Sequence, residues 1–214
     1  MLGVIECKIM DETDPQQSTK LPFEVALIVA HDNFYGIGQN NNLPWRCKED
    51  MQWFKQKTLG HVVVMGRNTF ESMGSKPLKD RVNIVVSRTL PLDTEGVQVA
   101  RTPSQALSLF AERWVPDPCR SLFVIGGNAI YKAFKPLANR IFLTQLDLHC
   151  LTDTKFPGLN LSENEWSLLS EDRKQLEVTI NPGVKFYANN TLTEATKETP
   201  KQLTNISFKE YTAR

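Results

Sequence analysis

The sequence has little that would bind a metal, cross a membrane or direct secretion. Its 214 residues include four cysteines without a C-x-x-C pair and three scattered histidines, so we expect free thiols and no zinc site. No apolar run approaches the roughly 20 residues that span a bilayer. The first 20 residues carry acids where a signal peptide has a basic start and an apolar run. These absences predict a cytoplasmic protein with no metal and no membrane contact.

Charge of one sign is also scarce over the whole chain. The formal net charge is +1, so no overall field favours nucleic acid as a partner. Between Pro44 and Leu90, however, nine Lys and Arg residues stand against four acids, a surplus of five. This local surplus favours binding of a compact anionic ligand. An ordinary basic surface explains it equally well.

The composition indicates one soluble globular domain. The chain is 41% hydrophobic and 23% charged, which is ordinary for such a domain, and it is long enough to bury one sizeable core. Residues 1–22 are expected to form an N-terminal extension and residues 23–214 the domain. The polar stretch 189–202 is expected to be a long loop or excursion from the domain. A monomer is the simplest assembly.

Short apolar runs alternate with helical patterns along most of the chain. Strands are predicted at residues 23–30, 61–66, 81–87, 121–127 and 140–148, and helices at 48–58, 68–73, 103–114 and 128–138. After Trp166, "EWSLLSED" and "ISFKEYTAR" look like strands with no strong helix between them. The pattern predicts an α/β fold: a mixed, mostly parallel central sheet flanked by helices, with an antiparallel C-terminal edge strand.

Three of the predicted strands end in residues suited to phosphate groups. Gly126-Gly127 would let the backbone approach a ligand closely, and Met-Gly-Arg at Arg67 and Val-Ser-Arg at Arg88 add guanidinium and hydroxyl donors. Together they indicate a multiply phosphorylated dinucleotide, although a Gly-Gly turn alone is equally well explained as structural. The usual G-x-G-x-x-G fingerprint is missing, since "GIGQNN" has Asn41 in the third glycine position.

One carboxylate stands out in the predicted helix of residues 48–58. Asp50 shares a helical face with Phe54 at i+4 and Lys57 at i+7. An acid buried beside a phenyl ring is costly unless it is paired or functional, and burial would raise its pKa. A solvated acid in the first turn of a helix is the competing explanation, and helix position alone leaves the choice open.

The motifs taken in order resemble dihydrofolate reductase. The order is "LIVA", "GIG", "NLPW", "EDMQWFKQKT", "VVVMGRNTFESM", "PLKDRVNIVVSR", "FVIGGNAIY", "IFLTQLD" and "DTKFP". The resemblance covers residues 23 to about 172, with a weaker match at the terminal strand. It implies hydride transfer from NADPH to dihydrofolate, giving tetrahydrofolate, with dihydrofolate and antifolates such as methotrexate as small-molecule partners.

The resemblance assigns roles to individual residues. Asp50 would promote protonation of the pterin, Thr144 would support the acid, and Trp45 and Leu43 would form the pocket wall and the mobile loop above it. The remaining substrate-binding residues would be Ile28, Val29, Ala30, Phe54 and Arg81, with the Ile28 carbonyl accepting from the ring amine and Arg81 holding the glutamate carboxylate. The cofactor-binding residues would be Ala30, Ile37, Gly38, Gly66, Arg67, Asn68, Thr69, Ser72, Ser87, Arg88, Ile125, Gly126, Gly127 and Tyr131.

Ser87 and Arg88 are expected at the 2′-phosphate, which makes NADPH the donor. In this family "GIGQNNNLPW" is a lid, in which Gly36 and Gly38 would give conformational freedom and Pro44-Trp45 would anchor the far end. Two departures from the family pattern are Lys79-Asp80 before Arg81, where many members have Pro-Gly, and Asn128 in place of a third glycine.

Two other functions compete with this one. A reductase of a pyrimidine in riboflavin synthesis shares the fold, but the Leu-Pro-Trp motif and Asp50 argue against it. A binding module that keeps the nucleotide site without catalysis, for RNA or a partner protein, is disfavoured because every catalytic match is intact.

Overall fold

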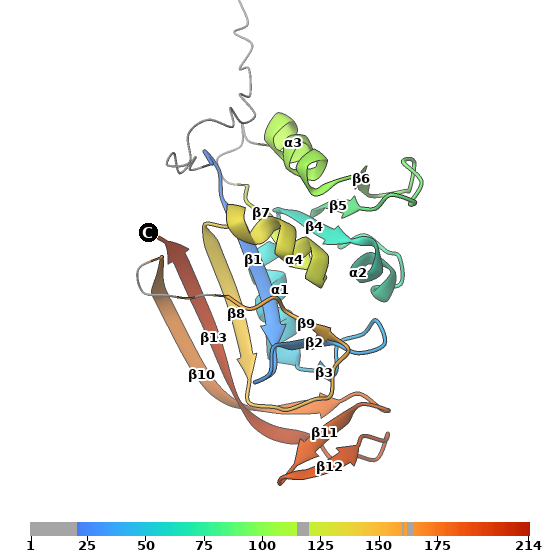
Figure 1. Ribbon diagram of the computed structural model, residues 1–214, viewed down its shortest axis with the longest axis vertical. Coiled ribbons are helices and arrows are strands. Elements are labelled where there is room, and N and C mark those ends of the chain that lie inside the picture. The colour runs from blue at the N-terminus through green and yellow to red at the C-terminus, as the bar shows by residue number, and fades with distance from the viewer. Residues whose placement is uncertain (1–20, 115–119, 160, 162–164) are drawn as a thin grey trace, which may run out of the picture.

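The structure is a computed structural model that describes residues 21–114, 120–159, 161 and 165–214 (Figure 1). The expected N-terminal extension therefore lies outside the described residues, apart from Leu21 and Pro22.

A central sheet of nine strands organises the molecule, in the order β3-β10-β13-β8-β1-β7-β4-β5-β6. Six neighbouring strands are parallel: β8 (Arg140–Leu146), β1 (Val25–His31), β7 (Leu122–Gly126), β4 (Val62–Gly66), β5 (Val82–Val86) and β6 (Gln98–Ala100). β10 (Trp166–Ile180) and β13 (Gln202–Ala213) are antiparallel, as is the two-residue β3 (Trp45–Arg46). The predicted mixed, mostly parallel α/β fold is confirmed.

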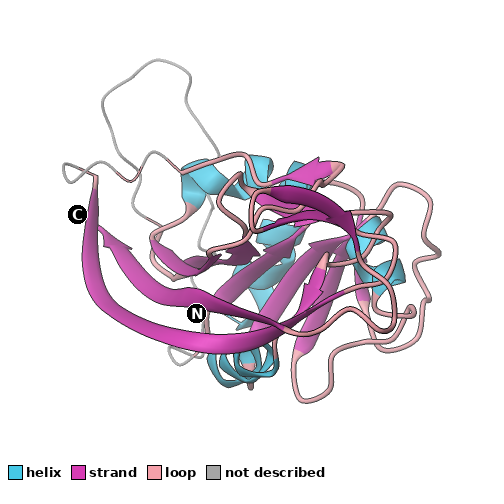
Figure 2. Ribbon diagram, turned by 90° about the horizontal axis from the view of Figure 1, so that it is seen from below, coloured by secondary structure: helices cyan, strands magenta, loops and turns pink. Residues whose placement is uncertain are grey.

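The C-terminal strand, β13, was predicted at the edge of the sheet and lies inside it. β13 runs antiparallel between β8 and β10, so β10 and β3 form this end of the sheet. Figure 2 shows the long, curved strand that ends at the C-terminus. The pairing of β13 with β8 matters for the site, because β8 carries Thr144.

Side-chain alternation on β1 divides the core into two layers. Val25, Leu27 and Val29 face one layer with α3 (Pro103–Trp114) and α4 (Asn128–Phe134). Ala26 and Ile28 face the other layer with α1 (Lys48–Thr58) and α2 (Arg67–Ser72). Successive side chains of a strand point to opposite faces, so a strand covered on both sides is apolar throughout.

The helix predicted for residues 128–138 is divided. α4 ends at Phe134 and a 3₁₀ turn, η1 (Lys135–Leu137), follows it. Pro136 has no backbone N–H to continue an α-helix, and its ring clashes with the preceding turn. The helices predicted for residues 48–58 and 103–114 have the predicted bounds.

The polar stretch expected as a loop contributes to a β-hairpin. β11 (Lys185–Ala188) pairs with β12 (Thr191–Glu194), and the intervening Asn189 and Asn190 have φ angles of 48° and 64°. Two central residues with positive φ are typical of the turn that suits a two-residue hairpin, and asparagine tolerates this conformation. The hairpin is anchored because Phe186 is buried in a core cluster that also contains Trp45.

Helix α1 is fastened to the sheet by a charged cluster at its C-terminal half. The Lys57 ammonium lies 3.0 Å from a carboxylate oxygen of Glu210 on β13, and Arg140 on β8 pairs with the other oxygen. Nearer the middle of the helix, the Trp53 ring packs 5.9 Å from Phe142. Burial alone would raise the pKa of Glu210, but hydrogen bonds from Arg140 and Lys57 outweigh it and hold the pKa below its usual value.

Replacing Glu210 by Gln should destabilise the protein by about 1–3 kcal/mol at neutral pH, the scale for hydrogen bonds to charged groups. Because the folded-state pKa is lowered, this stabilisation is present above the unfolded pKa of about 4.3 and is lost as the pH falls through the folded value. Urea unfolding from pH 3 to pH 8 measures it. Glu177→Gln is the control, because the Lys201–Glu177 pair is exposed and should contribute under about 1 kcal/mol. Equal effects of the two substitutions would contradict the prediction.

Candidate active site

One cavity of about 720 Å³ opens at the carboxyl ends of the parallel strands. Its walls include Ala30 on β1, Gly66 on β4, Val86 on β5 and Gly126 on β7. Ligands bind in this position in open α/β sheets, and the volume is that of a small-molecule or cofactor site. The cavity joins an acidic end at α1 to a basic end at α2.

At the acidic end, Asp50 is buried in the first turn of α1 with 8% of its surface exposed. Burial raises the pKa of the Asp50 carboxyl, and the neighbouring Thr144 hydroxyl opposes the shift. The two side chains are not aligned into a regular hydrogen bond, since the Thr144 oxygen has no hydrogen-bond partner among the described residues. A carboxyl with a raised pKa in an apolar wall is suited to hold a proton at a higher pH than a solvated acid.

A second buried carboxylate shows by contrast what a structural acid looks like. Asp32 is fully buried, and its oxygens accept hydrogen bonds from the backbone N–H groups of Phe34, Gly36 and Cys150 at 2.9, 2.7 and 2.9 Å. Buried polar groups satisfied in this way organise loops. Asp50 has no such set of amide donors and lines the cavity, so the explanation as a solvated first-turn acid does not hold.

Tyr131 connects α4 to the end of β1. Its buried hydroxyl donates to the Ile28 carbonyl at 2.8 Å. Burial raises the pKa of Tyr131, and the negative charge of Asp50 adds to the effect. Ile28 was expected to accept from the ring amine of the substrate; a carbonyl oxygen has two lone pairs, so one remains after the bond from Tyr131.

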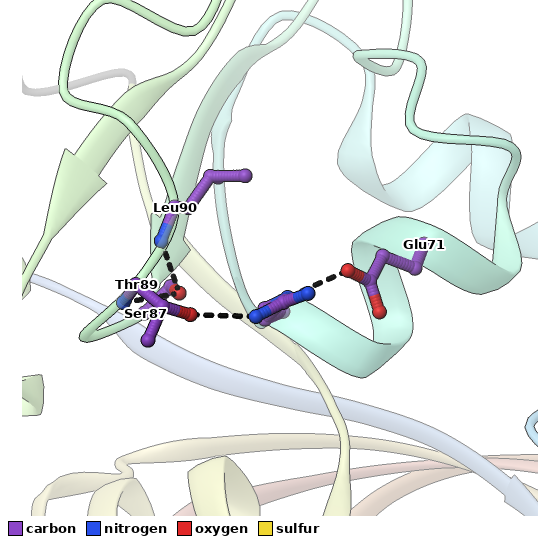
Figure 3. Close-up of polar contacts among 5 residues, drawn as sticks. Glu71, Ser87, Thr89 and Leu90 are labelled. Atoms are coloured by element: carbon purple, nitrogen blue, oxygen red, sulfur yellow. Dashed lines mark hydrogen bonds and ion pairs between the residues drawn. The ribbon is translucent and has the colours of Figure 1, made fainter.

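At the basic end, Arg67 is the centre of a small network of side chains (Figure 3). Its Nε donates to Glu71 at 2.6 Å and one terminal nitrogen donates to the Thr89 hydroxyl, also at 2.6 Å. The Ser87 hydroxyl oxygen accepts from the backbone N–H groups of Thr89 and Leu90 at 3.2 and 3.0 Å. Ser87 therefore shapes the loop, and it does not line the cavity.

Glycines bring the strand ends together between the two ends of the cavity. Gly126 has a φ of +110°, and a Cβ there would lie 3.0 Å from the Tyr131 ring. A Cβ on Gly66 would lie 3.2 Å from Ile130. The peptide between Gly126 and Gly127 is cis. Side chains at these positions would collide with α4, so the glycines let this helix pack closely against the strand ends that border the cavity.

Gly36 allows close packing in the segment expected to be a lid, and the conformational freedom expected for Gly36 and Gly38 stays a prediction. β2 (Gly36–Gly38) pairs with β9 (Thr154–Lys155), and neither Gly36 nor Gly38 has a positive φ. A Cβ on Gly36 would lie 2.6 Å from the Thr152 hydroxyl. The reversal of the chain is made by Asn40 and Asn41, with φ angles of 49° and 59°.

Most residues assigned by resemblance meet at this cavity. Those that line it are Ile28, Val29, Ala30, Ile37, Gly38, Leu43, Asp50, Phe54, Gly66, Arg67, Asn68, Thr69, Ser72, Arg88, Ile125, Gly126, Gly127, Tyr131 and Thr144.

Three assigned residues do not line the cavity: Trp45, Arg81 and Ser87. Trp45 is 1% exposed and packs in the core cluster beneath the hairpin. Arg81 is half-buried, donates to the Thr58 hydroxyl at 3.1 Å and lies 6.0 Å from the Phe54 ring. Trp45 therefore lies in the core cluster against which Trp53 of α1 packs. Arg81 lies outside the cavity, beside the ring of Phe54.

Other lining residues were not anticipated from the sequence. Met51 and Trp53 belong to the same helix as Asp50, so their nearness in sequence was an available signal. Asn128 lines the cavity and donates from its side-chain amide to the Lys155 carbonyl on β9. Thr154 also lines it from β9; it belongs to the motif "DTKFP", to which the sequence analysis assigned no site residue.

An α/β sheet with a cavity at its strand ends, a buried acid at one end of it and two arginines at the other, is the arrangement expected of enzymes that bind a phosphorylated nucleotide beside an organic substrate. Within the part of the chain that the structure describes, no cluster of side chains suits a metal ion, and no helix is long and apolar enough to cross a bilayer.

Comparisons with known proteins identify the particular family. The model of the dihydrofolate reductase family matches residues 24–189. The chain is 43% identical over 129 residues to dihydrofolate reductase type 3 of Salmonella typhimurium, covering 60% of this chain and 74% of that protein. It is 39% identical over 140 residues to dihydrofolate reductase of Haemophilus influenzae, covering 65% and 82%.

A solved structure agrees. Dihydrofolate reductase from Enterococcus faecalis, complexed with NADP(H) and RAB-propyl, superposes with a TM-score of 0.69 and 25% identity, covering 89% of this chain and 96% of that one. The chain belongs to the dihydrofolate reductase family, and its activity is the NADPH-dependent reduction of dihydrofolate.

Adding a methyl group at Gly36 tests the close packing of the lid strand. Gly36→Ala should lower the free energy of unfolding by about 1–3 kcal/mol, as is usual for overpacking, because Thr152 must move. Gly38→Ala is the matched control, since its nearest contact would be an ordinary 3.4 Å. Denaturant unfolding of both variants compares them. If Gly36→Ala proves no more destabilising than Gly38→Ala, the lid strand does not need close approach at Gly36.

Proposed function

We propose that Asp50 promotes protonation of the dihydrofolate ring during its reduction. The observation that supports this most directly is that Asp50 is the only acid among the described residues that line the cavity. Its burial raises its pKa, and a weakly basic ring nitrogen needs an acid that still holds a proton near neutral pH. Thr144, which lines the cavity from β8 and opposes the rise that burial causes in the pKa of Asp50, would support the acid.

The substrate would lie across the apolar wall beside Asp50. Phe54, one turn along α1 from the acid, and Ile28 at the end of β1 both line the cavity. The free lone pair of the Ile28 carbonyl would accept from the ring amine. Arg81, behind Phe54, would take the glutamate carboxylate, for which a guanidinium fork is well suited. This arrangement places the polar tail of the substrate at the protein surface.

The other end of the cavity fits the cofactor. When bound, a nicotinamide nucleotide supplies the hydride, while the protein supplies position and electrostatics. Gly126 and Gly127 would let the nucleotide lie close to the backbone, with Tyr131 beneath it. The phosphates would be held by side chains at the basic end, namely Arg67, Asn68, Thr69, Ser72 and Arg88, all of which line the cavity. Arg67 and Arg88 are two of the nine basic residues that give the segment between Pro44 and Leu90 its surplus of positive charge.

We also propose that residues 23–214 act as one domain, that the protein is a monomer and that it works in the cytoplasm. The continuous nine-stranded sheet, from β1 to β13, supports a single domain. Antifolates such as methotrexate would bind in the same cavity as the substrate. The family match argues against a pyrimidine reductase of riboflavin synthesis, and measured turnover would exclude a binding module without catalysis.

Asp50→Asn should lower the rate of hydride transfer at pH 7 by about 10²–10⁴-fold, the usual contribution of a positioned acid. The remaining rate should rise as the pH falls, because the proton then comes from solvent. The affinity for NADPH should stay nearly unchanged, since Asp50 lies at the other end of the cavity. Stopped-flow NADPH oxidation with dihydrofolate, together with fluorescence titration of NADPH, measures both quantities.

Stability provides the control for this substitution. A folded-state pKa above the unfolded value means that the ionised Asp50 destabilises the fold, and that this cost develops as the pH rises from the unfolded to the folded pKa. Asp50→Asn should therefore be at least as stable as the parent protein at pH 7. A loss of NADPH affinity as large as the loss of rate would show that Asp50 does not act on the substrate. Absence of methotrexate-sensitive turnover in the parent protein would reject the activity itself.

A further inference from the structure

Arg67 lines the cavity and is held on two sides, by Glu71 and Thr89, which are labelled in Figure 3. Glu71, one turn further along α2, accepts from Nε, and Thr89, in the loop after β5, accepts from one terminal nitrogen. A guanidinium has five N–H donors in a planar fork. Two are used here, so the other terminal nitrogen keeps both its hydrogens for an additional acceptor.

The position of Thr89 is set by its own loop. The Ser87 hydroxyl accepts from the Thr89 and Leu90 backbone N–H groups. Arg101 donates to the Ser87 and Leu90 carbonyls at 2.9 and 2.7 Å. These bonds hold the segment from both sides, so the Thr89 hydroxyl meets Arg67 without help from a ligand. Holding a side chain before binding lowers the entropy lost when an anion is bound.

Whereas Thr89 orients Arg67 for binding an anion, Glu71 offsets the positive charge of Arg67. Arg67 and Arg88 bring two positive charges to the basic end of the cavity, and the Glu71 carboxylate returns one negative charge 2.6 Å from Nε. Glu71 itself does not line the cavity. A phosphate dianion bound to Arg67 would be repelled by this carboxylate over a few ångströms, a distance within the Debye length at moderate salt.

We infer that Glu71 and Thr89 set the preference of this protein for NADPH over NADH by acting on Arg67 from opposite sides. Thr89 strengthens the site by aiming the guanidinium, and Glu71 weakens it by opposing the charge of the 2′-phosphate. The inference rests on the proposed function, which places the cofactor phosphates at the basic end of the cavity, and it adds that the 2′-phosphate expected at Arg88 is also within reach of Arg67. A carboxylate that limits affinity in this way also limits retention of the oxidised cofactor, which carries the same 2′-phosphate.

Paired ligands with and without the 2′-phosphate test the inference directly. Dissociation constants are measured by titration for NADPH against NADH, and for 2′,5′-ADP against 5′-ADP, with the full chain at about 20 mM and about 500 mM salt. The variants are Glu71→Gln, Thr89→Val and Thr89→Ser. Glu112→Gln, which removes an exposed acid from α3, is the matched control for loss of one negative charge.

Glu71→Gln keeps an oxygen that accepts from Nε and removes only the charge. It should tighten NADPH and 2′,5′-ADP roughly three- to tenfold at low salt, with a smaller gain at high salt because the charges are then screened. Thr89→Val should weaken the same two ligands by a similar factor, and Thr89→Ser should restore them. NADH, 5′-ADP and the Glu112→Gln protein should stay within about twofold of the parent values.

Two results would overturn the inference. One is a Glu71→Gln protein that binds phosphorylated and unphosphorylated ligands with the same change, or with none. The other is a Thr89→Val protein with full NADPH preference. Arg88→Ala separates these failures from failure of the proposed function. If it abolishes the NADPH preference while Glu71→Gln has no effect, only the role of Glu71 is wrong. If the parent protein does not discriminate NADPH from NADH at all, both are wrong.

Discussion

The burial of one carboxylate without amide donors is the constraint on which the rest of the site depends. Asp50 could lie in the apolar wall only if α1 is pressed firmly onto the sheet, because a looser helix would admit water to the acid. The Trp53 contact with Phe142, about one turn from Asp50, and the Lys57–Glu210–Arg140 cluster, about two turns from it, hold the helix against the sheet. Phe142 and Thr144 are two residues apart on β8, so their side chains point to the same face of the sheet. The strand that contacts α1 through Phe142 therefore also presents Thr144 on the side of Asp50.

The two ends of the cavity differ in charge, and the ends of β4 and β7 separate them. The acidic end has a single carboxyl in an apolar wall, whereas the basic end has two arginines open to solvent. Glycines at the ends of β4 and β7 let α4 pack closely against these strand ends, and the cavity extends past them from one end to the other. Under the proposed function, the proton is handled at one end of the cavity and the phosphates are bound at the other.

Residue patterns predicted much of the fold. The helix at residues 48–58 and the parallel strands were predicted from the pattern of apolar residues, because the spacing of apolar residues reflects which side chains a local element must bury. The assigned residues that do not line the cavity could not be recognised as such from sequence. Trp45 and Ser87 stand next to residues of the site in sequence, yet the backbone turns one into the core cluster and directs the other to the N–H groups of its own loop.

The sequence by itself determined the family and the α/β class, and it supplied the proposals for the phosphate-binding strand ends and for the acid, because these depend on residue types at fixed spacing. Only the tertiary structure decided that Asp50 is buried while Asp32 is satisfied, that Gly36 is needed for close approach to Thr152, that residues 189–202 begin in a hairpin, and that Glu71 and Thr89 share Arg67. Each of these depends on contacts between segments distant in the chain or on a rotamer, and the order of residues specifies neither one without the fold.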